Sequence, residues 1–141
     1  MAKENSRLMA NQREIMFSSA LRAAGAHTST IITNHCSKGG IFYLDITAEG
    51  GTATLDVKLQ TIDPIGGDWV DLANNVAGTG AYAFAQKTGT GSDQLTVYPG
   101  LTASGNAVCS GILPNQIRAV GTVGGSSTPT VTYSLGVDFI E

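Results

Sequence analysis

The sequence predicts an all-β protein, an antiparallel β-sandwich with jelly-roll-like connections, and three observations lead to this fold class. Residues 54–60 alternate polar and apolar side chains without a break, which gives a strand with one exposed and one buried face. Pro64, Gly66 and Gly67 follow and turn the chain into a second strand at 69–72, so a hairpin is expected. The composition, with 18 glycines and only 13% charged residues, suits short strands joined by tight turns.

The other strands are expected where β-branched and aromatic residues lie between glycine-rich turns. Residues 28–34 are rich in Thr and Ile, and residues 41–47 place three large apolar side chains on one face. Residues 81–86 alternate weakly, with Tyr82 and Phe84 on one face. The full set of expected strands is 28–34, 41–47, 53–60, 69–72, 81–86, 94–98, 117–123 and 130–140.

The last two of these segments are expected to form a closing hairpin. Residues 124–127 have the sequence Gly-Gly-Ser-Ser and provide its tip. The second arm, 130–140, alternates cleanly through Val131, Tyr133 and Leu135. Seven or eight short strands at this spacing, with no helix between them, are typical of a β-sandwich.

Residues 1–26 have a different pattern and are predicted to be an N-terminal arm, extended or partly helical, in front of a sandwich domain at 27–141. Leu8, Ile15 and Met16 have a rough helical spacing, and Gly25 would end such a helix. The apolar stripe is thin, and an isolated helix of this length is marginal in water. An extended arm that becomes ordered against a partner is therefore at least as plausible.

The charge distribution indicates which kind of surface this arm would bind. Residues 1–40 carry five basic and two acidic side chains, whereas residues 41–141 carry three basic and nine acidic ones. The arm is expected to bind an acidic surface, including the body of a neighbouring copy, and the alternative is a solvated tail. The residues expected to make these contacts are Arg7, Leu8, Arg13, Ile15, Met16, Phe17 and Arg22.

Several partner classes are not expected. Five scattered basic residues without interleaved aromatic residues make no nucleic-acid-binding stripe. The beginning of the chain lacks the pattern of a signal peptide, and no apolar run is long enough to span a membrane. Synthesis in a reducing cytoplasm favours free and mostly buried thiols at Cys36 and Cys109 over a disulfide between them.

Two groups of residues could ligate a metal ion, and for both a structural role is the stronger interpretation. His35 and Cys36 would need His27 and Cys109 to complete a zinc site, and adjacent side chains on a strand point to opposite faces. Asp63, Asp68 and Asp71 surround the Pro-Gly-Gly turn, but without the spacing of a calcium loop. Aspartates at turns usually bond the local backbone, so no metal or other cofactor is expected.

No catalytic constellation is apparent, and the protein is not expected to be an enzyme. Asp45 and Asp56 are expected on neighbouring strands and could mimic a hydrolase pair, but solvated carboxylates are the default. A nucleophile–base arrangement would have to recruit a histidine from 27–35. The glycines at 78–80 and 89–91 do not lead from a strand into a helix, as a phosphate loop requires.

The aromatic residues allow a further alternative. A row of exposed rings could bind sugars, although packing in the core is favoured for them. The rings concerned are Trp69, Tyr43, Tyr82 and Tyr133.

Three stretches resemble a family of small virion proteins of tailed bacteriophages, the capsid decoration or cement proteins. The first is Gly-Gly-Ile-Phe-Tyr-Leu-Asp-Ile-Thr-Ala at 39–48, and the second is the strand 54–60 with Asp63-Pro64 and Trp69. The third runs through 113–141 and contains Leu113-Pro114, Ile117-Arg118-Ala119-Val120, Gly124-Gly125 and Pro129. The similarity covers about residues 28–141 and rests on structural residues, so it distinguishes poorly between capsid, neck and tail components.

This resemblance implies a virion subunit that performs no reaction and stabilises an assembled shell on the capsid surface. Its implied partners are the major capsid protein and neighbouring copies of itself, in a homo-oligomer for which a trimer is favoured. It would be synthesised in the host cytoplasm, with neither nucleic acid nor membrane as a partner. The alternatives are another virion component, such as a tail, neck or baseplate subunit, or a carbohydrate-binding adhesion module that displays Trp69.

Overall fold

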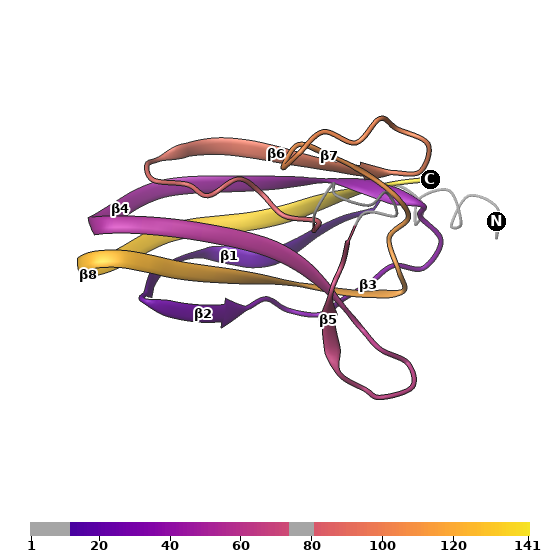
Figure 1. Ribbon diagram of the computed structural model, residues 1–141, viewed down its shortest axis with the longest axis horizontal. Coiled ribbons are helices and arrows are strands. Elements are labelled where there is room, and N and C mark those ends of the chain that lie inside the picture. The colour runs from indigo at the N-terminus through magenta and orange to yellow at the C-terminus, as the bar shows by residue number, and fades with distance from the viewer. Residues whose placement is uncertain (1–11, 74–80) are drawn as a thin grey trace.

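The computed structural model describes residues 12–73 and 81–141, and within these ranges the protein is all-β with no helix (Figure 1). The strands belong to one eight-stranded sheet with the order β1-β8-β4-β6-β7, to which β2, β3 and β5 are added at the side. Their bounds are β1 Arg13–Ala23, β2 Gly25–Thr28, β3 Ile32–Thr33, β4 Gly39–Ile62, β5 Trp69–Asp71, β6 Gly91–Tyr98, β7 Val108–Ser110 and β8 Gln116–Ile140. The all-β prediction is confirmed, but the sheet is mixed, because β6 and β7 pair in parallel.

Two long strands, β4 and β8, organise the sheet. They pair antiparallel from Gly39 opposite Ile140 to Thr61 opposite Ile117. Both strands double back at the same end of the molecule (Figure 1). The sheet therefore has a first half, in which 39–50 of β4 and 130–140 of β8 are joined by β1, β6 and β7. In its second half, 52–61 of β4 and 117–126 of β8 are joined by β2, β3 and β5.

The predicted closing hairpin of 117–123 and 130–140 is wrong. These segments are parts of the single strand β8, and each of them pairs with β4. Two glycines explain the difference. Gly125, at φ 113°, and Gly51, at φ 68°, have backbone conformations that other residues rarely adopt. A Cβ atom at Gly125 would lie 1.8 Å from the Thr52 carbonyl oxygen. The glycines therefore let two paired strands bend together, where a sequence pattern suggests a turn.

The core lies between the two halves of the sheet. Alternating residues of β4, such as Phe42 and Leu44 in the first half and Leu55 and Val57 in the second, join one cluster of buried side chains. The ring of Tyr133 reaches across this core, since a Cβ atom at Gly121 would be 2.1 Å from its hydroxyl oxygen. Gly121 and Tyr133 come from opposite halves of β8, so the two halves face each other in close contact.

Removal of the Tyr133 hydroxyl should stabilise the protein. This oxygen is buried and has no hydrogen-bond partner among the residues that the structure describes. Tyr133→Phe removes the unsatisfied polar group and keeps the ring, so the free energy of unfolding should rise by roughly 1 kcal/mol in urea denaturation. Tyr98→Phe is the matched control, because the Tyr98 hydroxyl donates a 3.0 Å hydrogen bond to the Glu141 carbonyl oxygen and should bring no gain. A loss of stability in Tyr133→Phe would contradict this assignment.

The described part of the predicted arm is a strand of the sheet. Residues 13–23 form β1, which pairs with β8 from Arg13 opposite Asp138 to Ala23 opposite Thr130. The extended alternative is therefore found in 13–23 and the helical one is not. Residue 26, where the two predicted domains divide, lies within β2. Register shifts between Ile15 and Ala20 turn the consecutive residues Met16 and Phe17 inward. The sequence of β1 therefore lacks the regular alternation by which a strand is recognised.

Other predicted segments agree more closely with the structure. The hairpin after residue 60 is present, with Ile62 of β4 opposite Trp69 of β5. Residues 81–87 are not a regular strand but run beside β4, where the Phe84 amide donates to the Val57 carbonyl oxygen at 2.9 Å. Tyr82 and Phe84 are buried on one face, as predicted. No helix in the described ranges has the length and apolar character needed to cross a membrane.

Candidate docking site

The outer face of the first half carries an open, largely apolar depression, which we call the Gly136 groove. Gly136 of β8 forms its floor, and Ile15 of β1 and Tyr43 of β4 lie on either side of Gly136 in the same register row. Ile15 and Tyr43 are 67% and 39% exposed, so two large side chains flank a position without one. The groove, which Arg13 and Asp138 complete, has a volume of about 600 Å³.

Charged groups surround the groove and give it an acidic balance. The Arg13 Nε atom lies 2.8 Å from Asp138 Oδ1 at one end. A second hollow continues past Ile15 and Tyr43 to Asp45, whose Oδ1 accepts a 3.0 Å hydrogen bond from Ser92. With Glu14 included, three acidic residues and one basic residue line these two hollows. The site suits an apolar partner segment that carries positive charge.

The structure divides the residues that were predicted to contact a partner. Arg13 and Ile15 line the Gly136 groove. Met16 and Phe17 are only 2% and 4% exposed and belong to the core, although Phe17 also lines the second hollow. Arg22 has a structural role, described next, and Arg7 and Leu8 lie outside the described residues. Sequence reasoning considered Tyr43 only as a possible sugar-binding ring and missed Gly136, for which the one available signal was a glycine in a regularly alternating strand.

Arg22 donates hydrogen bonds to backbone carbonyl groups at the irregular part of β1. Its Nη1 atom donates to the carbonyl oxygens of Tyr133 at 2.8 Å and Ala20 at 3.0 Å, and its Nη2 atom donates to that of Ser18 at 2.9 Å. The guanidinium carbon lies 4.4 Å from the centroid of the Tyr133 ring and 4.7 Å from that of Phe17. Burial raises the pKa of Tyr133, and the charge of Arg22 partly opposes that shift. Arg22 therefore replaces ladder hydrogen bonds where the strand register shifts.

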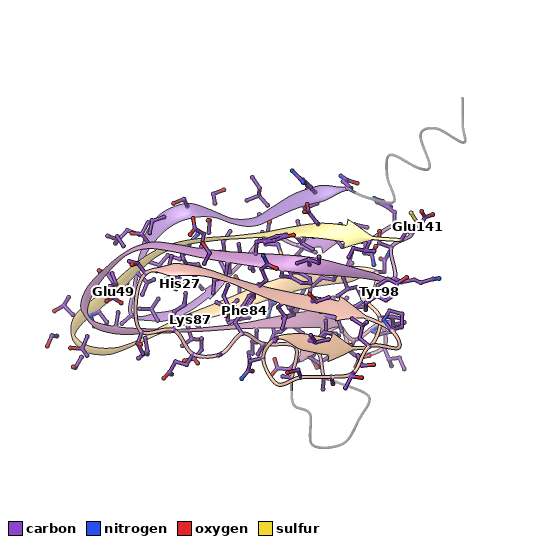
Figure 2. All side chains as sticks on the ribbon, turned by 90° about the horizontal axis from the view of Figure 1, so that it is seen from above. His27, Glu49, Phe84, Lys87, Tyr98 and Glu141 are labelled. Carbon is purple, nitrogen blue, oxygen red and sulfur yellow. The ribbon has the colours of Figure 1, made fainter. Side chains whose placement is uncertain are left out.

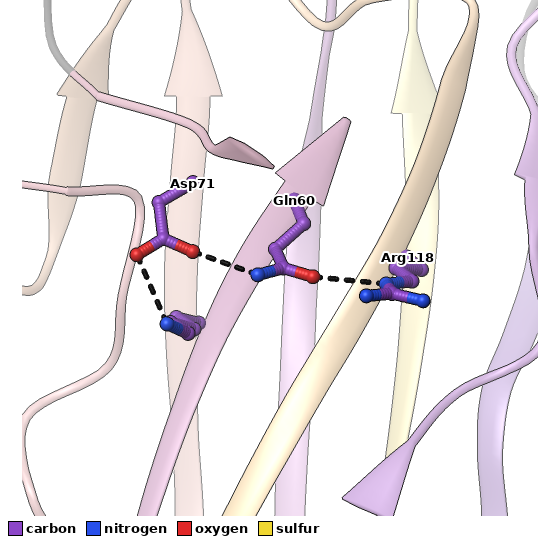
Figure 3. Close-up of polar contacts among 4 residues, drawn as sticks. Gln60, Asp71 and Arg118 are labelled. Carbon is purple, nitrogen blue, oxygen red and sulfur yellow. Dashed lines mark hydrogen bonds and ion pairs between the residues drawn. The ribbon is translucent and has the colours of Figure 1, made fainter. Parts of the chain in front are cut away.

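A row of polar side chains crosses the outer face of the second half (Figure 3). Gln60 of β4 donates to Asp71 Oδ1 of β5 at 2.8 Å and accepts a 2.9 Å hydrogen bond from Arg118 Nε of β8. Lys58 Nζ lies 2.9 Å from Asp71 Oδ2. The Arg118 guanidinium also lies over the Trp69 ring, 4.3 Å from its centroid. These bonds join the polar side chains of the row to one another, so we interpret the row as structural.

The Asp71 carboxylate should make the stability of the protein depend on pH in acid. Hydrogen bonds from Gln60 and then from Lys58 lower the pKa of Asp71 below its ordinary value of 3.8. The carboxylate binds fewer protons in the folded state, so its contribution is complete above that value and disappears as the pH falls through the lowered folded pKa.

Comparison of the wild type with Asp71→Asn in urea, at a series of pH values, measures this contribution. Because the Asp71 side chain is 46% exposed, the difference in unfolding free energy should be under about 1 kcal/mol near neutral pH, and it should shrink on acidification. Gln60→Met should weaken the same pH dependence. A difference that grows as the pH falls would contradict the assignment.

The aspartates considered for metal binding or catalysis have local partners, and Asp63 and Asp68 lie close together at the turn, where the Asp63 amide donates to the Asp68 carbonyl oxygen at 2.8 Å. Within the described ranges, no three His, Cys, Asp or Glu residues form a group that could hold a metal ion. Asp63 accepts a 2.9 Å hydrogen bond from the Ile65 amide, the local turn role that was expected. Asp45 and Asp56 do not lie on neighbouring strands but on different halves of β4, bonded to Ser92 and Gln86 respectively.

His27 and Cys109 do not join His35 and Cys36 in a group of three or more such side chains among the described residues. His27 Nε2 lies 2.8 Å from the Ala23 carbonyl oxygen. His27 lies on the side of the bend, whereas Tyr98 and Glu141 lie at the opposite end of the molecule (Figure 2). Cys36 and Cys109 are both free thiols. Cys36 is exposed, contrary to the expectation of burial, whereas Cys109 is buried and its pKa is raised to about 11 by that burial.

The aromatic residues do not form one platform. Tyr82 and Tyr133 are in the core, as expected. Tyr43 is exposed on the first half, and Trp69 pairs with Ile62 on the second half, outside the core cluster. A sugar-binding row of all four rings is therefore absent from this structure.

Comparisons with known proteins found no match: no protein family, no curated protein and no solved structure matches the chain.

Proposed function

We propose that this protein is a structural subunit of a tailed-bacteriophage particle, of the capsid decoration type. Two features support the proposal. One is the resemblance carried by residues 39–48, 54–69 and 113–141. The other is the bent sheet, whose two halves we interpret as the layers of a β-sandwich around a shared core. Such a body provides a rigid shape to which neighbouring subunits can bind.

The Gly136 groove is the observation that carries the proposal. Ile15 and Tyr43 stand exposed on a well-paired sheet, next to a position that lacks a side chain. An apolar depression of this kind favours a protein partner, because covering it removes apolar surface from water. Only 13% of the residues are charged, which is low for a surface that faces water throughout. We infer that subunit contacts cover part of this surface.

In this function the partners are the major capsid protein and neighbouring copies of the same chain. Repeated copies on a symmetric shell multiply weak individual affinities, so no single contact has to be strong. A closed ring, for which a trimer is favoured, matches the local symmetry of such a shell. The protein would be made in the host cytoplasm and would then join the capsid surface.

Two other functions are alternatives to a capsid decoration protein. A tail, neck or baseplate subunit would use the same groove on a different part of the particle. A carbohydrate-binding module would depend on Trp69, and it is disfavoured because Arg118 covers one face of that ring and no second exposed ring pairs with it in register. Titration with host glycans, followed by tryptophan fluorescence, would reveal such a module by a saturable change.

Cosedimentation with phage shells tests the proposed function. Purified full-length protein is mixed with shells that were assembled without it, and the pelleted chain is compared with the main shell subunit. We expect binding that saturates at a fixed ratio. Protein that stays in the supernatant over the whole concentration range would contradict the proposal.

A further inference from the structure

We propose that the Gly136 groove binds residues 1–11 of a second copy of this chain. The inference rests on the proposed function, because it names the partner of the same groove. The inference concerns contact between two copies of the chain, whereas the proposed function concerns contact with the shell. An experiment can therefore refute the exchange between copies without refuting shell binding, and the reverse.

The position at which the N-terminal segment joins the sheet supports this occupant. The Gln12 carbonyl oxygen accepts a 3.0 Å hydrogen bond from the Phe139 amide, directly before β1 begins at Arg13. Gln12, the first residue that the structure describes, therefore lies at the end of the groove that Arg13 and Asp138 form. Eleven residues in an extended conformation reach at most roughly 40 Å, which is far enough to meet the groove of an adjacent copy.

The chemistry of the segment complements that of the groove. Residues 1–11 contain Arg7, Leu8 and Met9 in succession, so an apolar pair follows a basic side chain. The segment has two basic residues and one acidic residue, whereas residues 12–141 have six basic and ten acidic ones. Leu8 and Met9 match the apolar walls at Ile15 and Tyr43, and Arg7 matches the acidic surroundings.

A second copy is a better source of this segment than the same chain. The ladder between β1 and β8 continues to Gln12, so the chain enters the sheet in line with the strand. To fill its own groove, the segment would have to reverse direction within a few residues of Gln12. Residues 1–11 contain Asn and Ser but neither Gly nor Pro, the two strongest turn formers. Exchange between copies needs no reversal and can close into a symmetric ring.

Chemical crosslinking between two populations of full-length protein tests the exchange. One population carries Leu8→Cys and the other carries Ser134→Cys, which lies in the adjoining hollow, both in a Cys36→Ser background. Cys109 is buried and its pKa is raised, so it should not react. After treatment with a short bismaleimide, we expect a covalent dimer of the two populations. Thr122→Cys, exposed on the second half of β8, replaces Ser134→Cys as the matched control and should give little product.

Blocking the groove should abolish the crosslink. Gly136→Val places a side chain on the floor, where a Cβ atom would lie 3.4 Å from the nearest atom, so the strand itself should tolerate it. In the Ser134→Cys population this change should lower the dimer yield roughly tenfold, which corresponds to about 1.4 kcal/mol of binding free energy. Thr122→Val is the control that should leave the yield unchanged. Circular dichroism must show that each variant retains the wild-type spectrum.

Three outcomes would overturn the exchange. They are an equal yield with Thr122→Cys, a yield that Gly136→Val does not change, and, in a chain with both Leu8→Cys and Ser134→Cys, crosslinking within the monomer only. Binding to shells without any crosslink would refute the exchange and leave the proposed function intact. A crosslink without shell binding would refute the proposed function alone.

Discussion

Gly125→Ala should destabilise the protein by roughly 3 to 5 kcal/mol, because the substitution combines backbone strain with steric overlap. Gly125 has φ 113°, and an added Cβ atom would lie 1.8 Å from the Thr52 carbonyl oxygen of the paired strand. Neither strand can move away without opening the bend that places the two halves of the sheet around one core. Urea denaturation followed by tryptophan fluorescence measures the loss.

Gly67→Ala separates the two causes. Gly67 has φ 79°, but nothing lies within 4 Å of an added Cβ atom there. This control should lose only the conformational part, about 1 to 2 kcal/mol. Equal losses in both variants would show that the close approach of β4 and β8 at the bend does not limit the fold.

Arg22→Met should lower the unfolding free energy by roughly 2 to 4 kcal/mol, since it leaves carbonyl groups unpaired and removes the cation from two rings. The lost partners are the carbonyl oxygens of Ser18, Ala20 and Tyr133. Methionine retains much of the apolar length, so the difference reports mainly on the guanidinium group. Hydrogen exchange should show the largest loss of protection in β1.

Arg13→Met is the matched control for this substitution. Arg13 is on the same strand, but its side chain is 85% exposed and its partner Asp138 lies at the surface. Loss of such an ion pair should change stability by less than about 1 kcal/mol. If Arg13→Met and Arg22→Met lowered the unfolding free energy equally, the hydrogen bonds of Arg22 would not be what stabilises the irregular part of β1.

Local patterns predicted the strands better than their connections. The alternation in 54–60 and the Pro-Gly-Gly turn were enough to place the β4–β5 hairpin, because register there follows from a short loop. The bends of β4 and β8 were not predictable, since glycines at 50–51 and 124–125 signal a change of direction equally well for a turn or for a bend. Only the pairing of the two strands along their whole length distinguishes these cases.

The candidate site was predictable in part for a related reason. Arg13 and Ile15, two of the predicted contact residues, line the Gly136 groove. Met16 and Phe17 were predicted with them because the irregular register of β1 conceals which side chains point inward. Gly136 was missed, and Tyr43 was not linked to Ile15, since the three residues come together only through pairing between distant strands. Long-range pairing of this kind leaves no trace in local periodicity.

The composition of purified phage particles tests the central claim most directly. Quantitative mass spectrometry of particles from an infection in which the phage encodes this chain gives its ratio to the main shell subunit. The proposed function predicts that the chain copurifies with the particles in an amount comparable to that of the shell subunit. Its absence from particles, or its presence in only a small fraction of that amount, would contradict a role as a capsid decoration protein.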